Sequence, residues 1–322
     1  MRIVPASATI LDELDRQSMA QRIELCGRLC YKSEDKISAT STESFIRRVI
    51  GHGHNSVLEM AALTLRVHCE TEAIIDQFLA SHLKYLQIDR PEKKVKILLI
   101  SGTVRAFREM YQSWSNVKLV KAIIAMLVVR HPLLFLDLGG KRGFLPQTGV
   151  EVEKLSLANV DALPTALLIK HRHLAVRFIT NRAVTHELVR HRPCSFLQES
   201  QRYCRYSQNK FGNEVTFIRP LFFTEHSDEY CLWQQAMLEA EKTYLQLLRT
   251  SSPQAARTVL PNSCKTEIIV YTNLLAWLHI FRMRTTQAAE PSMREVMIPL
   301  LHAMQSRFPA IFSGLQGELG DN

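Results

Sequence analysis

The chain has 322 residues, 46% of them hydrophobic, which is enough to bury a substantial core in one large domain or in one domain with an insertion. Lys and Arg number 40 against 31 Asp and Glu, and the formal net charge of +9 indicates either a nucleic-acid surface or a site for anionic small molecules. No apolar run of about 18 residues, no signal-peptide pattern and no paired spacing of the seven cysteines is present, so we expect a cytoplasmic protein with reduced cysteines and no membrane span.

The amino-terminal part is expected to form two helices and a strand. Apolar residues recur at helical spacing over residues 8–32 and 42–50. The second helix should end at the Gly-His-Gly-His sequence of residues 51–54, because its glycines allow a tight turn. The two histidines of this turn have no cysteine or carboxylate at ligand spacing, so we expect no metal there. Alternation of apolar residues over 63–67 then predicts a strand.

A long segment, from residue 69 to about residue 172, separates this strand from the next distinctive motif. It contains two candidate helices, at 71–87 and 104–128, around an apolar strand at 95–100. The glycine-containing loop at 138–143 lacks the preceding strand and the glycine spacing of a dinucleotide fold. We therefore expect no phosphate binding at that loop.

One stretch of this segment resembles a later part of the chain. Residues 100–107 and 271–277 place an alanine and an aromatic residue in the same way. Chance similarity is an alternative explanation for stretches this short. We interpret the long segment as an insertion and not as a separate domain.

A strand at 174–180 is expected to lead into the helix that carries the most distinctive motif. Apolar residues have helical spacing over 183–189. Pro193 disfavours helical geometry at the residue before it, so this helix should end at Arg192. Cations in a last turn suit the helix dipole, which explains the Arg-His-Arg sequence of residues 190–192 without any ligand.

The helix dipole does not explain the residues that follow this helix. Ser200-Gln201-Arg202-Tyr203 supplies a hydroxyl, an amide, a guanidinium and an aromatic ring, which suits a phosphorylated ligand that contains a ring. Nine basic residues are interleaved with apolar ones in this region: Lys170, Arg172, Arg177, Arg182, Arg190, Arg192, Arg202, Arg205 and Lys210. This interleaving favours a folded anion site over a solvated basic arm, and it leaves RNA open as a ligand.

The carboxy-terminal third alternates strands and helices. Residues 212–213 predict a turn, 215–218 a strand and 227–250 a helix. A β-branched run at 266–272 predicts a further strand, which a helix at 273–284 follows.

That last helix carries both an aromatic stripe and several polar residues. Trp277, Phe281 and Arg284 lie three to four residues apart, and such a stripe is usually core. The polar residues of the helix are therefore either exposed or functional. They are Asn273, His279, Arg282 and Arg284.

Taken together, these motifs resemble those of the flavin-dependent thymidylate synthases. Arg-His-Arg, seven residues and then Ser, which is the family signature, spans Arg190 to Ser200. The flanks at 181–189 and 200–207 are similar to the entry and exit of that motif, and residues 53–59 are similar to the family's flavin-contacting turn. The resemblance extends over roughly residues 20–68 and 173–312.

The resemblance implies a fold, an activity and an assembly. We expect an α+β fold, a mainly antiparallel sheet covered by helices, in a single domain of residues 1–322 that a largely helical insertion at about 69–172 interrupts. The implied reaction is reductive methylation of dUMP to dTMP, with methylenetetrahydrofolate as carbon donor, FAD as cofactor and NADPH as reductant. The implied assembly is a homotetramer whose sites draw on several subunits.

The resemblance also assigns roles to residues. Those expected to bind the nucleotide are Glu187, Arg190, Gln198, Glu199, Ser200, Gln201, Arg202, Arg257 and Arg284. The positions expected to contact the flavin are Ser56, Arg190, His191, Arg192, Gln198, Asn273, Leu275 and His279. Arg284 is the expected catalytic residue beside the uracil ring, and because an arginine stays protonated it should act electrostatically and not as a base.

The side-chain chemistry of three of these residues also allows other roles. Ser200 is a nucleophile or a binding hydroxyl, and we favour binding because no activating base can be identified from its neighbours. His191 is a general acid or a flavin contact, and the resemblance favours the contact. Glu187 binds the nucleotide or forms a helix-surface pair with Arg190, three residues on.

Two departures from the family pattern lead to a competing hypothesis. Leu275 stands where the family commonly has arginine, which removes a charge-assisted hydrogen bond worth roughly 1.5–3 kcal/mol. Glu290 adds a negative charge where the family's longer branch often has histidine. A catalytically inactive relative that binds nucleotide or flavin is therefore the main alternative. An RNA-binding protein is the next, although only Tyr203 and Tyr206 are interleaved with basic residues as RNA binding requires.

Overall fold

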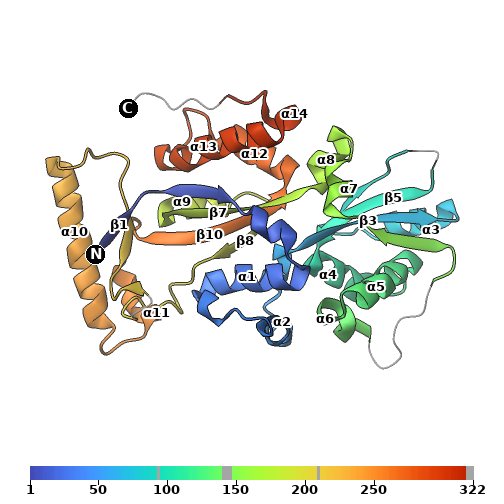
Figure 1. Cartoon of the computed structure of the whole chain (residues 1–322), viewed down its shortest axis with the longest axis horizontal. Helices are drawn as coiled ribbons and strands as arrows, with labels where there is room; N and C mark the ends of the chain where they lie inside the picture. The colour runs from blue at the N-terminus through green and yellow to red at the C-terminus, as the bar shows by residue number, and fades with distance from the viewer. Residues whose placement is uncertain (93–94, 140–146, 209–210, 317–322) are drawn as a thin grey trace.

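A computed structural model describes residues 1–92, 95–139, 147–208 and 211–316, and it has an α+β fold, as predicted. Two four-stranded antiparallel sheets lie side by side, and a two-stranded parallel pair stands at the far end of the first (Figure 1). That pair joins β1 (Arg2–Val4) to β9 (Thr216–Ile218), next to the long helix α10 (Asp228–Leu247). The helix and strand predicted at 227–250 and 215–218 are thereby confirmed.

The first sheet has the order β2-β7-β10-β8. Its strands are β2 (Ser7–Ile10), β7 (His173–Asn181), β10 (Lys265–Asn273) and β8 (Ser195–Gln198). β7 and β10 pair along their whole length, from Lys265 opposite Asn181 to Asn273 opposite His173. The strands predicted at 174–180 and 266–272 are confirmed. The prediction that the first helix starts at residue 8 is wrong, because residues 7–10 pair with β7 as an edge strand.

Helices cover both faces of this sheet (Figure 1). One face carries α9 (Arg182–Leu188), α12 (Leu274–Arg284), α13 (Pro291–Arg307) and α14 (Pro309–Phe312), and the other carries α1 (Met19–Tyr31) with α2 (Ser41–Gly51). Alternate residues of β10 supply the two cores, because successive strand side chains point to opposite faces. Ile268 and Val270 pack with Trp277 and Phe281, whereas Ile269 belongs to the core on the α1 side. The aromatic stripe of α12 is therefore core, as its spacing indicated.

The second sheet has the order β4-β5-β3-β6 and was only partly predicted. Its strands are β4 (Gln87–Asp89), β5 (Ile97–Thr103), β3 (Ala62–Cys69) and β6 (Val150–Lys154). β3 precedes the segment that we interpreted as an insertion, and that segment supplies the other three strands. Its helices are α3 (Glu72–Leu79), α4 (Val104–Trp114), α5 (Lys118–Arg130), α6 (Pro132–Phe135), α7 (Leu157–Asp161) and α8 (Thr165–His171).

The helices predicted in this segment are shorter than expected. The one predicted at 71–87 ends at Leu79 because residues 87–89 pair with β5. The one predicted at 104–128 is divided between α4 and α5. Residues 138–139 of the glycine-containing loop lie in a 3₁₀ turn (Leu136–Gly139), and residues 140–143 lie outside the described part of the chain.

Remaining turns are short. The 3₁₀ turns are η1 (Asp12–Arg16), η2 (Glu34–Lys36), η3 (Asn55–Met60) and η6 (Arg257–Val259), and a short helix, α11 (Pro253–Ala256), precedes the last. η3 follows the Gly-His-Gly-His turn, where Gly53 adopts a positive φ of 68°. Gly212 and Asn213 also have positive φ, as expected at the predicted turn.

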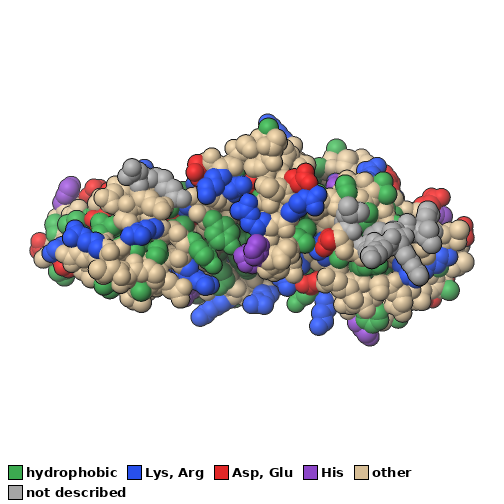
Figure 2. Space-filling model, turned by 90° about the horizontal axis from the view of Figure 1, so that it is seen from below, with side chains coloured by type: hydrophobic (Ala, Val, Ile, Leu, Met, Phe, Trp, Pro, Cys, Tyr) green, Lys and Arg blue, Asp and Glu red, His purple; other side chains and the backbone are tan. Residues whose placement is uncertain are grey.

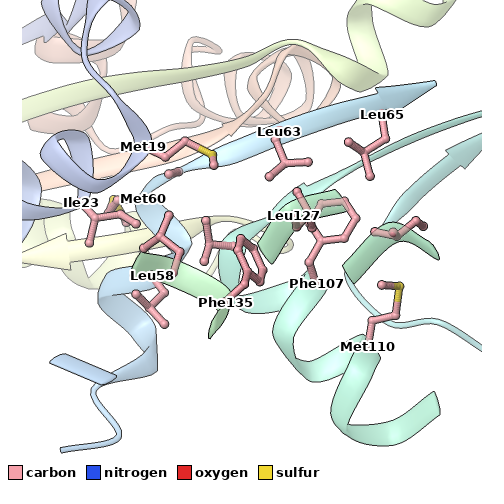
Figure 3. Close-up of a cluster of buried hydrophobic side chains, with 14 of the residues drawn as sticks. Met19, Ile23, Leu58, Met60, Leu63, Leu65, Phe107, Met110, Leu127 and Phe135 are labelled. Carbon is pink, nitrogen blue, oxygen red and sulfur yellow. The ribbon is translucent and has the colours of Figure 1, made fainter. Parts of the chain in front are cut away.

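One hydrophobic core joins the inserted helices to the amino-terminal part of the chain (Figure 3). Ile23 of α1 and Leu58 of η3 pack in the same cluster as Phe107 of α4, Leu127 of α5 and Phe135 of α6. These five side chains are all fully buried. The inserted helices therefore fix the position of η3, which is the turn that resembled a flavin-binding segment.

A chain of buried polar groups crosses the second sheet. Thr64 and Ser101 join their hydroxyls at 2.7 Å, and the Ser101 hydroxyl lies 2.7 Å from Nδ1 of His171. Nε2 of His171 lies 3.2 Å from Asp89. The order Ser, His, Asp matches a hydrolase triad, but Ser101 is only 1% exposed and its hydroxyl is already shared with Thr64. This chain of groups is therefore structural.

Acid should destabilise the protein between about pH 6.5 and pH 4. Burial lowers the pKa of His171 to about 4, against the opposing effect of Asp89, and burial likewise lowers the pKa values of His131, His173 and His191 to about 4. A histidine with a lowered folded pKa takes up its proton more readily in the unfolded chain. Stability is therefore full above pH 6.5 and falls below it, by about 1.4 kcal/mol per pH unit for each histidine.

Urea denaturation at a series of pH values measures this slope. His171→Asn should make the slope shallower by about one proton, because one of the four histidines is removed. His302→Asn, at an exposed position of α13, is the control and should leave the slope unchanged. An unaltered slope in His171→Asn would contradict the prediction.

Candidate active site

The carboxy-terminal ends of α9 and α12 meet over the first sheet. Nε of Arg284 donates to Nε2 of His191 at 3.0 Å, and Nη1 of Arg284 forms an ion pair with Glu187. Glu187 and Arg284 are 97 residues apart in the sequence. The alternative that Glu187 serves as a surface partner of Arg190 is wrong, because its described ion pair is with Arg284.

Strand pairing explains why these helix ends meet. Asn181 ends β7 and caps α9, since its side chain accepts from the backbone N–H of Val184. Asn273 ends β10 and caps α12 in the same way through Ala276. β7 and β10 are antiparallel, so the two helices start at opposite ends of the pair and run back over the same face toward each other. Each strand is thus followed by a helix that returns one polar end to the middle of the sheet.

His191 is held neutral in this cluster. Burial, together with the nearby Arg284 and His279, lowers its pKa to about 4. Because its Nε2 accepts from Arg284, the ring proton lies on Nδ1. The His279 ring stands edge-on at 6.0 Å from the His191 ring. At neutral pH the cluster therefore fixes one guanidinium between a carboxylate and a neutral imidazole.

The motif arginines stand outside this cluster. α9 ends at Leu188, so the helix predicted to run to Arg192 stops four residues early. Arg190, Arg192 and His279 are exposed. In the view from below, Lys and Arg side chains also gather around a hydrophobic hollow in the middle of the molecule (Figure 2). Neither Arg190 nor Arg192 pairs with a carboxylate among the described contacts. Both therefore present a positive charge at the surface.

Several of the basic residues that suggested an anion site are structural. Lys170 pairs with Asp89, Arg172 with Asp15 and Arg177 with Glu267. Arg205 donates to the backbone of Leu248, and Lys210 lies outside the described residues. Part of the positive charge of this region therefore stabilises the fold. Sequence composition alone could not distinguish these structural cations from ligand-binding ones.

The strand end at Gln198–Ser200 is tied to α9, α1 and β10. Nε2 of Gln198 donates to Thr185 at 3.0 Å and to Thr266 at 3.2 Å. The backbone N–H of Ser200 donates to the carbonyl of Cys30 at 3.0 Å. Ser200 has no described histidine partner, which agrees with a binding hydroxyl and not an activated nucleophile.

Glu199 and Gln201 point into the protein. Glu199 is 2% exposed, accepts from Tyr206 at 2.9 Å and pairs with Lys265 at 2.9 Å. Gln201 is buried, and its amide donates to the sulfur of Cys264. Arg202 next to it is exposed, with its guanidinium 5.6 Å from the Tyr203 ring. Alternate residues of this stretch thus serve the core and the surface.

Two cavities flank the strand end. One, of about 420 Å³, is lined by Cys30, Tyr31, the turn at residues 53–57, Leu197 and Arg105; we call it the turn cavity. It contains the exposed Ser56, the expected flavin ligand. The other, of about 460 Å³, is lined by charged groups of both signs, among them Glu199, Lys265 and Glu267. Far fewer charged residues line the turn cavity than line the other one.

The remaining expected site residues have distinct surroundings. The Asn273 amide group caps α12 and donates to the carbonyl of Lys170 at 3.0 Å, so it is already engaged within the chain. Leu275 is 43% exposed. Arg257 is partly exposed in η6, with no described contact to Arg284. Glu290 caps α13 by accepting from Met293 at 2.8 Å, which gives this departure a structural reason.

The structure thus brings together Glu187, His191, His279 and Arg284, and it places Ser56 in a separate cavity. Sequence reasoning missed Arg105 and Tyr31 in the wall of that cavity. Only the similarity between residues 100–107 and 271–277 pointed at Arg105. No helix in the described chain is long and apolar enough to cross a membrane, and no group of three metal-binding side chains is found there.

Helix ends converging over an antiparallel sheet define an α+β protein with a guanidinium-centred polar site. Comparison with known families makes this more specific: the model described as "Thymidylate synthase complementing protein" matches residues 12–83 and 165–310. The chain belongs to this family. The match leaves out residues 84–164, a shorter interruption than the one we expected at 69–172.

Curated relatives carry the same family relationship in their names. Proteins named flavin-dependent thymidylate synthase are 31% identical in Corynebacterium diphtheriae over 146 residues, and 31% identical in Mycobacterium avium over 163 residues. A protein of the same name from Mycobacterium tuberculosis is 32% identical over 163 residues. The alignments cover 42% of this chain for the first and 45% for the other two. The chain spans only 58% of the first relative's length and 63% of the others'.

Proposed function

We propose that this protein is a flavin-dependent thymidylate synthase, which converts dUMP to dTMP with methylenetetrahydrofolate as carbon donor, FAD as cofactor and NADPH as reductant. The family membership supports this proposal, as do the names of the relatives. The observation that carries it is the guanidinium of Arg284, fixed by Glu187 and His191. A nucleotide phosphate and an electron-rich ring both call for fixed cations of this kind.

The substrate would be bound by arginines and polarised by one of them. Arg190, Arg202 and Arg257 are the candidates for the phosphate dianion, because each reaches the surface and a guanidinium can grip phosphate through two donors. Arg284 would lie against the uracil ring and stabilise negative charge as it develops there. His191 and Glu187 occupy two of its donor groups, so the others are left to point at the ring.

The turn cavity fits one part of a flavin. Its Tyr31, Val57 and Leu197 walls suit a planar ring, and Ser56 offers a hydroxyl at its edge. When bound, FAD would supply hydride transfer. Ser56 would orient it, and the exposed Arg190, Arg192 and His279 would hold its charged or polar parts.

We further propose a homotetramer with shared sites and a single domain in each subunit. Among the described contacts, none joins the Arg284 cluster to Ser56, Arg202 or Arg257. Sites completed by neighbouring subunits would unite these groups. The core shared by α1 and the inserted helices supports one domain, and nucleic acid is not among the expected partners.

The main alternative is an inactive relative that binds nucleotide or flavin. The observation that favours it is the exposed, uncharged Leu275 at a position where the family commonly has arginine. Glu290 no longer supports it, because its carboxylate is used in capping α13.

Purified protein should bind FAD and release the C5 proton of dUMP as the carbon is transferred. The measurement is the flavin absorption spectrum, followed by tritium release from [5-³H]dUMP with NADPH and methylenetetrahydrofolate. Flavin binding with tritium release supports the proposal. Flavin or dUMP binding without tritium release would favour the inactive relative, and binding of neither ligand would exclude both hypotheses.

A further inference from the structure

Arg105 is a side chain of the inserted segment that reaches the turn cavity. The segment at residues 84–164 lies outside the family match, yet Arg105 lines the same cavity as Ser56. We infer that Arg105 is a flavin-binding residue that donates hydrogen bonds to the ring system of the cofactor. This inference rests on the proposed function, and it assigns part of the cofactor site to the insertion.

The backbone of Arg105 is fixed by a strand that passes directly into a helix. β5 pairs with β3 from Ile97 to Thr103, and Thr103 then caps α4 by accepting from the N–H of Ala106 at 3.2 Å. Arg105 is the second residue of that helix. Its Cα position therefore follows from the sheet and does not depend on a flexible loop.

Two carboxylates fix the guanidinium. Nη1 donates to Glu59 at 2.6 Å and Nε donates to Glu109 at 2.6 Å. Glu59 belongs to η3, as Ser56 does, so the same turn carries the hydroxyl and the carboxylate that orients Arg105. A guanidinium held from two sides loses little side-chain freedom when a ligand binds.

The same two contacts decide what kind of group Arg105 can bind. A guanidinium has five N–H donors, and within the described part of the chain these two hydrogen bonds are the ones that Arg105 makes. The two N–H donors of Nη2 and the second N–H donor of Nη1 therefore remain available to a ligand. Because two carboxylates already balance its charge, a phosphate gains little here, whereas the carbonyl oxygens of a neutral planar ring accept without a charge penalty.

The walls of the cavity point to the same class of ligand. Tyr31, Val57 and Leu197 offer apolar surface, and the Arg105 side chain is 38% exposed. A flat heteroaromatic ring would contact these walls with its faces and meet Ser56 and Arg105 with its polar edge. The ring system of a flavin has both features.

The local structure around Arg105 repeats the one around Leu275. In both places the last strand residue, Thr103 or Asn273, is the helix cap, and the second helical residue follows it as Arg105 or Leu275. The similarity between residues 100–107 and 271–277 is thus a shared strand-cap-helix unit. In the inserted unit this position carries a cation beside a cavity, and in the carboxy-terminal unit it carries none.

Titration of the full chain with FAD, followed by quenching of flavin fluorescence, tests the inference without any turnover. Arg105→Gln should weaken FAD binding by about ten- to a hundredfold, because charge-assisted hydrogen bonds are lost. Arg90→Gln is the matched control. It also removes an arginine that pairs with a carboxylate, Glu72, but Arg90 does not line the cavity, so binding should stay within about twofold.

Further variants separate direct binding from displacement of the turn. Arg105→Lys keeps the charge but not the planar fork, so it should bind FAD more weakly than the wild type. Glu59→Gln leaves Arg105 held by Glu109 and should lose less affinity than Arg105→Gln. Near-UV circular dichroism, recorded on each variant, reports whether the core is intact.

The outcomes are distinct. If wild-type protein fails to bind FAD, the proposed function fails and the inference falls with it. If the wild type binds and both Arg105 variants bind equally well, the inference alone is wrong. Equal losses in Glu59→Gln and Arg105→Gln, with no further loss in the double variant, would show that Arg105 only positions the turn, and would also overturn it.

Discussion

Arg284→Gln should lower the rate of dUMP turnover by about a hundred- to a thousandfold, the usual effect of removing one preorganised donor from a developing charge. Glutamine keeps an N–H donor but has no positive charge. The change also leaves Glu187 without its cation and His191 without its donor. Binding of dUMP should weaken much less than turnover, since the phosphate would be held by other arginines.

Single-turnover tritium release and equilibrium binding of dUMP separate these two effects. Arg282→Gln is the matched control, because Arg282 is an exposed arginine of the same helix and should change turnover by less than about twofold. Glu187→Gln should give an intermediate loss, because it removes the ion pair but keeps the guanidinium. Full tritium release by Arg284→Gln would refute the catalytic role of this residue.

The two inner strands of the first sheet were predicted correctly from the sequence. β7 and β10 are strands of nine residues each, and for β10 the β-branched run at 266–272 was a sufficient signal. Residues 7–10 failed as a prediction because an edge strand of four residues is too short to show alternation. β4 is shorter still, with three residues, and only its pairing with β5 in the structure identifies it as a strand.

Whether the sequence could predict the contacts of a site residue depends on how far along the chain its partner lies. The meeting of Glu187 with Arg284 depends on two strand-cap-helix units that run in opposite directions, and no spacing within either motif encodes it. The resemblance named both residues without giving their contact. Asn273, by contrast, precedes a helix directly, so its capping role could have been predicted from local sequence alone.

Arg105 shows a further limit of sequence reasoning. Its position in a unit similar to residues 271–277 was visible, but chance explained the likeness equally well. Only the strand pairing that places β5 beside β3, and so α4 beside η3, gives the likeness a structural meaning.

Glu267→Gln should destabilise the fold by about 3–5 kcal/mol, the typical cost of removing one partner from a buried ion pair. Glu267 is 5% exposed and faces three cations: Lys265 at 2.6 Å, Lys32 at 2.7 Å and Arg177 at 3.1 Å. Burial raises its pKa, but Lys265 and Lys32 outweigh burial and lower the pKa to about 2. A neutral glutamine would leave these three cations without the carboxylate that they share.

The sign of the pH dependence follows from that pKa. Because the folded carboxylate has the lower pKa, its contribution is complete above about pH 4.5 and is lost as the pH falls through 2. The free energy of unfolding of the Glu267→Gln variant should therefore be lower than that of the wild type by a constant amount from pH 5 to pH 8. Urea denaturation at pH 7 measures this difference.

Glu34→Gln is the control for the Glu267 prediction, since Glu34 lies 3.7 Å from Lys32 with 44% of its side chain exposed, and its loss should cost less than about 1 kcal/mol. Equal stabilities for Glu267→Gln and the wild type would mean that water or conformational relaxation compensates the three cations. The prediction also bears on the site, because the carbonyl of Glu267 accepts from the N–H of Glu199 at 2.7 Å. Disorder around Glu267 would reach Gln198 and Ser200 through this bond, so binding of dUMP should weaken in the variant even where the protein remains folded.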